Sequence, residues 1–153
     1  MKEGKERLLH VISFILFVIY LISISYFLFF SERYGRTEFN DDYRYNLVLF
    51  QEIKRFLKYR HVIGIEGFIV NLFGNVLAFT PFGFCLPLIN SRYKNFFKIV
   101  IWSFLFSLSI ETIQLLYKIG IFDVDDLLLN TIGGAIGYLF LKLLTFTFRK
   151  KKK

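Results

Sequence analysis

The sequence contains few of the residues on which soluble enzymes and disulfide-rich secreted domains depend. It has one cysteine, two histidines and two prolines in 153 residues. The single thiol, Cys85, cannot form an internal disulfide, and His10 and His61 are too few to support a Cys/His metal site. No Ser/His or Cys/His pair supports a covalent nucleophile either. What is abundant is apolar: 55% of the residues are hydrophobic and 20% are aromatic, more than a soluble domain of this size usually carries.

The net charge of +8 comes from basic residues that lie beside apolar runs and not from a basic domain. This placement favours the anionic headgroups of membrane lipids as partners. It argues against nucleic acid as a ligand.

Four apolar stretches are long enough to cross the hydrocarbon layer, which takes about 20 residues of helix. They run roughly over residues 8–30, 67–89, 96–117 and 127–148. We expect the first to remain as an anchor, because it is uncharged, longer than a signal-peptide core and not followed by a small-residue cleavage site. The sequence therefore predicts an all-α integral membrane protein, a single domain over residues 1–153 with four transmembrane helices in a compact bundle.

The distribution of basic residues predicts that both termini are cytoplasmic. Four crossings place the two ends on one side, and both ends and the connection between the second and third spans are basic. These residues are Lys2, Lys5, Arg7, Arg92, Lys94, Lys98, Arg149, Lys150, Lys151, Lys152 and Lys153. Residues 31–66 and the turn 118–126 would then lie outside. The outer segment is the exception to the charge rule, since it carries Arg33, Arg36, Arg44, Lys54, Arg55, Lys58 and Arg60.

An amphipathic interfacial helix is predicted over about residues 46–59 in this first outer segment. Leu49, Ile53 and Leu57 recur at helical spacing, with charged residues on the other side. Asn46 is placed to cap the start of this helix. We expect the helix to lie in the headgroup layer and bind lipid phosphates, and an ordinary solvated loop helix is the alternative.

Three of the spans each present one polar or small face. Residues spaced by i, i+4, i+7 and i+11 lie on one side of a helix. Such residues are Asn71, Asn75 and Ala78 in the second span, Ser107, Glu111, Gln114 and Lys118 in the third, and Asp126, Asn130, Gly133 and Gly137 in the fourth. At a rise of about 1.5 Å per residue, Asn71, Gln114 and Asn130 lie about one turn deep and Asn75 and Glu111 two to three turns deep. These levels predict one pocket that opens outward.

Glu111 is the main candidate for a catalytic residue. A charged carboxylate facing lipid costs several kcal/mol, so Glu111 should be protonated, paired or inside a hydrated cavity. Asp126 could share a proton with it as an acid/base pair. The predicted substrate-binding residues are Asn71, Asn75, Gln114, Asp123 and Asn130. The alternative is a hydrogen-bonded network that only holds the helices together, at about 1 kcal/mol per contact, while Gly133, Gly134 and Gly137 permit close helix approach.

The acidic turn Asp123-Val124-Asp125-Asp126 lies at the mouth of the predicted pocket. No cofactor and no metal site is predicted, although a divalent cation at Asp123 and Asp126 is an alternative. The other interpretation is that Asp123 and Asp125 are solvated and that one of the aspartates caps the fourth helix.

Several short motifs, taken together and in this order, resemble the VanZ-like family over about residues 46–140. The motifs are Asn71-Leu-Phe-Gly-Asn75, Pro81-Phe-Gly83, Leu86-Pro87, Ser109-Ile-Glu111-Thr-Ile-Gln114, Asp123-Val-Asp-Asp126 and Asn130-Thr-Ile-Gly133. Asn46-Leu47 and Phe50 are similar to the family's Asn-Leu-x-Pro-Phe segment, with Val48-Leu49 where that segment usually has its proline.

The resemblance implies a bacterial plasma-membrane protein related to one associated with resistance to the glycopeptide teicoplanin. Such a protein would act at the outer leaflet, in resistance or in maintenance of the cell envelope, on a glycopeptide or a lipid-linked cell-wall precursor. Whether it is an enzyme stays open. The alternatives are a membrane hydrolase or transferase in which Glu111 is the general base or acid, and a non-catalytic assembly or transport subunit. The oligomeric state also stays open.

Overall fold

The chain folds into four long helices joined by short connections, as a computed structural model of residues 2–30 and 42–150 shows. The elements are α1 (Lys2–Phe30), β1 (Tyr45–Asn46), α2 (Gln51–Ile89), η2 (Ser91–Tyr93), α3 (Phe96–Leu116), β2 (Phe122–Asp123) and α4 (Val124–Lys150). Within these residues, α1, α2, α3 and α4 are long and apolar enough to cross a membrane. The predicted all-α membrane fold is confirmed.

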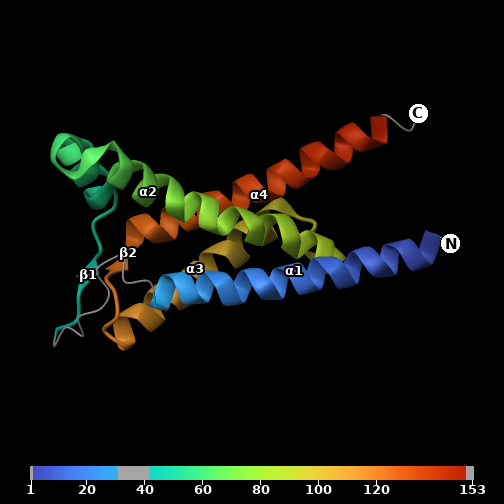
Figure 1. Cartoon of the computed structure of the whole chain (residues 1–153), viewed down its shortest axis with the longest axis horizontal. Helices are drawn as coiled ribbons and strands as arrows, with labels where there is room; N and C mark the ends of the chain where they lie inside the picture. The colour runs from blue at the N-terminus through green and yellow to red at the C-terminus, as the bar shows by residue number, and fades with distance from the viewer. Residues whose placement is uncertain (1, 31–41, 151–153) are drawn as a thin grey trace.

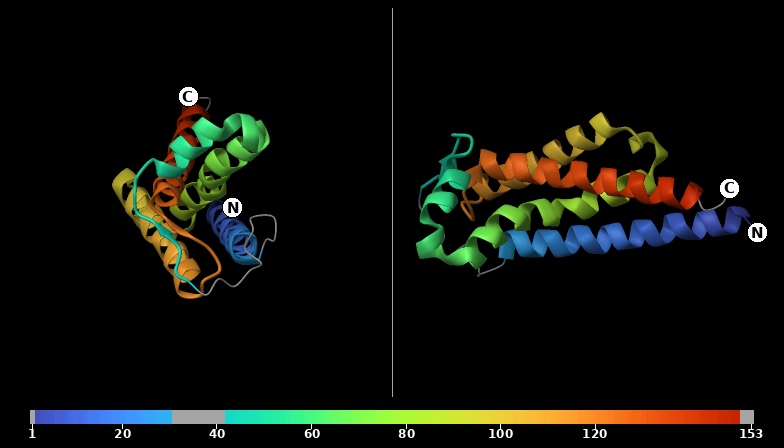
Figure 2. Two further views of the ribbon diagram at one scale, coloured as in Figure 1. Left: turned by 90° about the vertical axis from the view of Figure 1, so that its left-hand side faces the viewer. Right: turned by 90° about the horizontal axis from the view of Figure 1, so that it is seen from above.

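The four helices run up and down along the length of the molecule (Figure 1). The start of α1 and the end of α4 lie at the same end, as four crossings require, and the connection between α2 and α3 lies toward that end (Figures 1 and 2). The two short strands and the start of α2 lie at the opposite end, which we call the strand end. Every polar contact of the candidate site described below lies between this end and the middle of the bundle.

Helix α2 has 39 residues without a break and changes direction along its length (Figure 2). Its first part crosses the strand end, and the remainder runs along the bundle (Figure 2). The part that is long and apolar enough to span a membrane is Leu72–Ile89. The helix predicted over about residues 46–59 begins later, at Gln51, because Asn46 belongs to β1, and it continues without a break into the second span. Its place in the headgroup layer stays a prediction.

Helix α3 ends at Leu116, so Lys118 does not continue its polar face as predicted. The N–H of Ile119 donates to the carbonyl of Gln114 at 3.1 Å, and the N–H of Lys118 donates to the carbonyl of Leu115 at 3.1 Å. With a φ of 54° at Lys118, these two bonds form a Schellman motif, in which a left-handed residue closes the helix.

The apolar contacts of the bundle centre on α2. Phe79 is fully buried and packs with Ile24 of α1 and Ile110 of α3. Phe82 of α2 stacks on Phe106 of α3 with 4.8 Å between the ring centroids. Many apolar side chains on the outer faces stay exposed, which suits helices surrounded by lipid because lipid tails are as apolar as these side chains.

Helices α2 and α4 approach closely because α4 carries glycines where they meet. A Cβ at Gly133 would lie 2.3 Å from the carbonyl oxygen of Val76, and a Cβ at Gly137 would lie 2.0 Å from that of Thr80. Real Cβ atoms do not come so near to a backbone oxygen. The predicted role of these glycines in close helix packing is confirmed.

Replacing Gly137 by alanine should therefore separate α2 from α4. The clash is with rigid backbone, so we expect Gly137→Ala to lower the free energy of unfolding by about 1–3 kcal/mol. The matched control is Gly74→Ala in α2, where an added Cβ meets nothing within 4 Å. Thermal unfolding in detergent, followed by circular dichroism, measures both variants. Equal midpoints for Gly137→Ala and wild type would contradict the close approach.

Candidate functional site

Two short strands at the strand end join segments that lie far apart in the sequence. β1 and β2 pair in parallel, with Tyr45 opposite Phe122 and Asn46 opposite Asp123. The backbone N–H of Phe122 donates to the carbonyl of Arg44 at 3.0 Å. The side-chain amide of Asn46 donates to Oδ1 of Asp123 at 3.1 Å, across 77 residues of sequence. The segment before α2 is thus fastened to the segment before α4.

The carboxylate of Asp125 caps the start of α2. It accepts hydrogen bonds from the backbone N–H groups of Phe50, of Glu52 at 2.9 Å and of Ile53 at 3.2 Å, and Asp125 is only 1% exposed. Phe50 occupies the N-cap position with a φ of 65° and provides no side-chain cap. The interpretation of Asp125 as solvated is therefore wrong, and so is that of Asn46 as the cap. An acidic residue from α4 satisfies the N–H groups that a helix start leaves without partners.

Asp123 caps α4 in turn, which confirms that one aspartate of the acidic turn has this role. Its Oδ1 accepts the backbone N–H of Asp125 at 2.8 Å, in addition to the amide of Asn46. Asp123 is 7% exposed. Burial raises the pKa of Asp123 above its ordinary value, while the two hydrogen bonds act in the opposite direction.

Glu111 lies inside the bundle directly behind this turn. It is 3% exposed, and its Oε2 accepts the backbone N–H of Asp123 at 3.1 Å. This bond gives the Glu111 carboxyl a partner on the backbone, and which of the three expected states it occupies stays a prediction. Ser107 and Gln114 of the same α3 face are also buried. The side chain of Gln114 packs against Gly120. A Cβ added at Gly120 would lie 3.1 Å from the Cβ of Gln114.

Two further contacts join α4 to its neighbours. The amide of Asn75 in α2 donates to Oδ1 of Asp126. Deeper in the bundle, the amide of Asn130 donates to Oγ of Ser107 at 2.9 Å. Asn71 belongs to α2, but its side chain lies outside the described residues.

The seam between α3 and α4 holds two buried polar atoms without a hydrogen-bond partner. They are Oδ1 of Asn130 and Oγ of Ser103. Ser103 lies against Gly134, where a Cβ would come within 1.9 Å of the hydroxyl oxygen. Gly134 thus makes room for a polar side chain of α3, which is the close approach predicted for it.

The structure therefore links several of the predicted site residues through successive contacts. From the strand end inward these contacts are Asn46–Asp123, Asp123–Glu111, Asn75–Asp126 and Asn130–Ser107. The single pocket expected from Glu111, Gln114, Asn71, Asn75, Asp126 and Asn130 stays a prediction. The sequence did not predict that Asp125 and Ser103 would be buried among these polar residues. It predicted Asn46 as a helix cap and not as a partner of Asp123.

The part of the chain that the structure describes contains no candidate metal site. None of its clusters combines three or more His, Cys, Asp or Glu side chains in a way that could hold an ion. Oδ1 of Asp123 already accepts two hydrogen bonds. A divalent cation at Asp123 and Asp126 stays an untested alternative.

Four apolar helices that enclose a buried polar cluster define an α-helical, multi-pass membrane protein. The family model for VanZ/LLP1 matches residues 17–145, and the chain belongs to this family. It is also similar to Protein VanZ of Enterococcus faecium, with 36% identity over 63 residues that make up 41% of this chain and 38% of that protein. The alignment thus covers well under half of the relative's length. No solved structure matches the chain.

The cap on α2 can be tested by removing its acceptor. Asp125→Ala leaves three backbone N–H groups of α2 without their acceptor, so we expect the free energy of unfolding to fall by about 2 kcal/mol. Asp42→Ala removes an exposed aspartate from the same end of the molecule and should have no effect. Denaturation in detergent measures both. If Asp125→Ala and Asp42→Ala lower the free energy of unfolding equally, the loss of a negative charge, and not the loss of the cap, causes the decrease.

Stability at the strand end should also depend on pH. Burial raises the pKa of Glu52 and repulsion from Asp123 and Asp125 adds to this, so Glu52 and Asp123 both hold a proton more tightly in the folded state. Stability should therefore decrease as the pH rises above about 4, the ordinary carboxyl range, through the raised folded pKa values. Glu52→Gln combined with Asp123→Asn should flatten this dependence. Unfolding midpoints across about pH 4 to 6 measure it, and an unchanged slope would contradict the assignment.

Proposed function

We propose that this protein acts at the outer leaflet of the bacterial plasma membrane and lowers sensitivity to a lipid-anchored glycopeptide such as teicoplanin. It does so by binding or altering an amphiphile at the strand end, through the polar cluster around Glu111. Membership of the VanZ/LLP1 family and the similarity to Protein VanZ support this proposal.

The distribution of exposed basic residues supports an orientation with the strand end outside. Arg7 and Lys150 are exposed near the two ends of the chain. Arg92, Lys94 and Lys98 are exposed in the connection that lies toward the same end. Because cytoplasmic loops carry an excess of Lys and Arg, this end is assigned to the cytoplasm.

The observation that carries the proposal is the buried carboxyl of Glu111 beside the Asp123 turn. An ionisable residue inside a spanning helix is costly, and such residues most often serve a function. Glu111 lies at the inner side of a cluster that also holds Asp123, Asp126 and Asn75. Asp123 belongs to β2, so this cluster lies near the strand end, which the proposed orientation places outside.

The proposal is tested by comparing teicoplanin susceptibility among strains that carry the wild type, Glu111→Gln or Asp126→Asn at matched membrane abundance and a strain from which the gene is deleted. Each amide keeps an oxygen that can accept the existing hydrogen bond but loses the ability to ionise. We expect teicoplanin susceptibility to rise at least fourfold, roughly the effect of losing one charged contact. The control is Ser109→Ala, which removes an exposed hydroxyl bonded only within its own helix turn. Unchanged susceptibility after deletion of the whole gene would refute the proposal.

A membrane enzyme that acts on a lipid-linked cell-wall precursor is the second candidate. It is favoured by Glu111 and Asp126, two carboxyl groups that face the bundle interior from adjacent helices. Glu111 would be the general base or acid, and Asn75 would orient the substrate through Asp126. Accumulation of lipid-linked precursors in the Glu111→Gln strain, at normal membrane abundance of the variant, distinguishes this candidate. Normal precursor levels would exclude it.

A further inference from the structure

The first turns of α2 carry three exposed basic side chains within one arc of the helix. Lys54 and Lys58 are one turn apart, and Arg55 lies beside them, so the three cover about 100° of the helix surface. We call Lys54, Arg55 and Lys58 the basic face. The segment that bears it crosses the strand end, and the rest of α2 then runs along the bundle (Figure 2).

Apolar side chains lie next to the basic face and are equally exposed. The turn before the helix consists of four such residues: Leu47 at 63%, Val48 at 62%, Leu49 at 48% and Phe50 at 44% exposed. On the helix itself, Leu57 and Tyr59 are 47% and 45% exposed. Charged groups beside exposed apolar ones are typical of a surface that lies at the boundary between headgroups and acyl chains.

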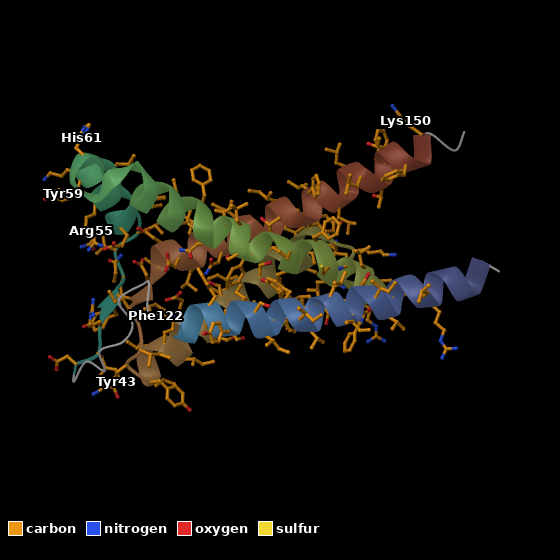
Figure 3. All side chains as sticks on the ribbon, viewed as in Figure 1. Tyr43, Arg55, Tyr59, His61, Phe122 and Lys150 are labelled. Carbon is orange, nitrogen blue, oxygen red and sulfur yellow. The ribbon has the colours of Figure 1, made fainter. Side chains whose placement is uncertain are left out.

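Arg55 and Lys58 both have partners within the protein, and all three side chains of the basic face are exposed. Arg55 pairs with Glu52 at 2.7 Å, but its side chain is 56% exposed, and surface pairs of this kind are weak. The ammonium of Lys58 lies 5.4 Å from the ring centroid of Tyr59, which orients it without neutralising it. Figure 3 shows Arg55 and Tyr59 at the strand end of the molecule, the same end as Phe122 of β2.

We propose that the basic face binds the phosphate of an anionic lipid while the Leu47–Phe50 turn contacts its acyl chains. The proposal rests on the proposed function and specifies it, since it names the amphiphile as a phosphate-bearing lipid. Guanidinium and ammonium groups match phosphate oxygens in charge and in hydrogen-bonding capacity. Their long stems can lie along apolar surface while the charged ends reach the headgroups.

The contacts that hold the strand end together would bring a lipid headgroup bound at the basic face close to the polar cluster around Glu111. The cap from Asp125 and the bond between Asn46 and Asp123 hold the start of α2 against the start of α4. Arg55 is near enough to Asp123 for its charge to lower the pKa of that carboxyl, against the larger effect of burial. A phosphate on the basic face would therefore lie beside the turn whose backbone N–H reaches Glu111.

Lipid binding can be measured on the full-length protein in detergent. The probes are dioctanoyl phosphatidylglycerol, dioctanoyl phosphatidylcholine and inorganic phosphate, each titrated while the thermal unfolding midpoint is followed. The test variant is Lys54→Gln/Arg55→Gln/Lys58→Gln. The matched control is Arg92→Gln/Lys94→Gln/Lys98→Gln, which removes the same charge from exposed positions toward the opposite end of the molecule.

We expect phosphatidylglycerol to stabilise the wild type and the control variant, and the test variant to bind it at least tenfold more weakly. Phosphatidylcholine should bind more weakly than phosphatidylglycerol, and inorganic phosphate should give no comparable shift. The proposal is overturned if the test variant binds like wild type, if the control variant loses as much affinity, or if either comparison probe matches phosphatidylglycerol. Lipid binding is measured on the purified protein and teicoplanin susceptibility in cells, so a failure of one proposal is distinguishable from a failure of the other.

Discussion

The capping of α2 by Asp125 is the interaction on which the strand end depends. A helix that begins near a membrane surface has N–H groups that need partners, and here the partner is a carboxylate from the first turn of α4. The same backbone turn pairs with β1 and donates an N–H to Glu111. One short stretch, Phe122–Asp125, therefore fixes the start of two helices and the environment of the buried carboxyl.

Helix α4 organises the rest of the bundle because it approaches both α2 and α3 closely. Toward α2 it presents Gly133 and Gly137, which let the backbones approach. Toward α3 it presents Asn130 and Gly134, which face Ser107 and Ser103. Close van der Waals packing and polar contact, which includes the Asn75–Asp126 bond toward α2, are the two means by which helices associate when lipid removes the hydrophobic driving force.

Features that depend on local sequence were predictable from the chain. The long apolar runs predicted the four spans, and the spacing of Glu111 and Gln114 with Ser107 predicted a buried face of α3. The small residues of α4 predicted close packing. These properties follow from helical periodicity and the thickness of the bilayer, which act within one element.

Features that depend on contacts between distant segments were not predictable in this way. The role of Asp125 arises from a contact 75 residues away in the sequence, and the pairing of β1 with β2 is equally remote. The left-handed backbone at Lys118 was missed because glycine is the usual residue there. Asn46 did carry a signal in its family motif, but its partner could be identified only when the strands were seen together.

The origin of the α2 cap also constrains the order of events during biosynthesis. The chain emerges from its amino terminus, so α2 is made well before Asp125, which caps it, becomes available. Until then the first N–H groups of α2 have only water or headgroups as partners. The cap on α2 can therefore form only after the first turn of the last helix has been made, which leaves the start of α2 dependent on a much later part of the chain.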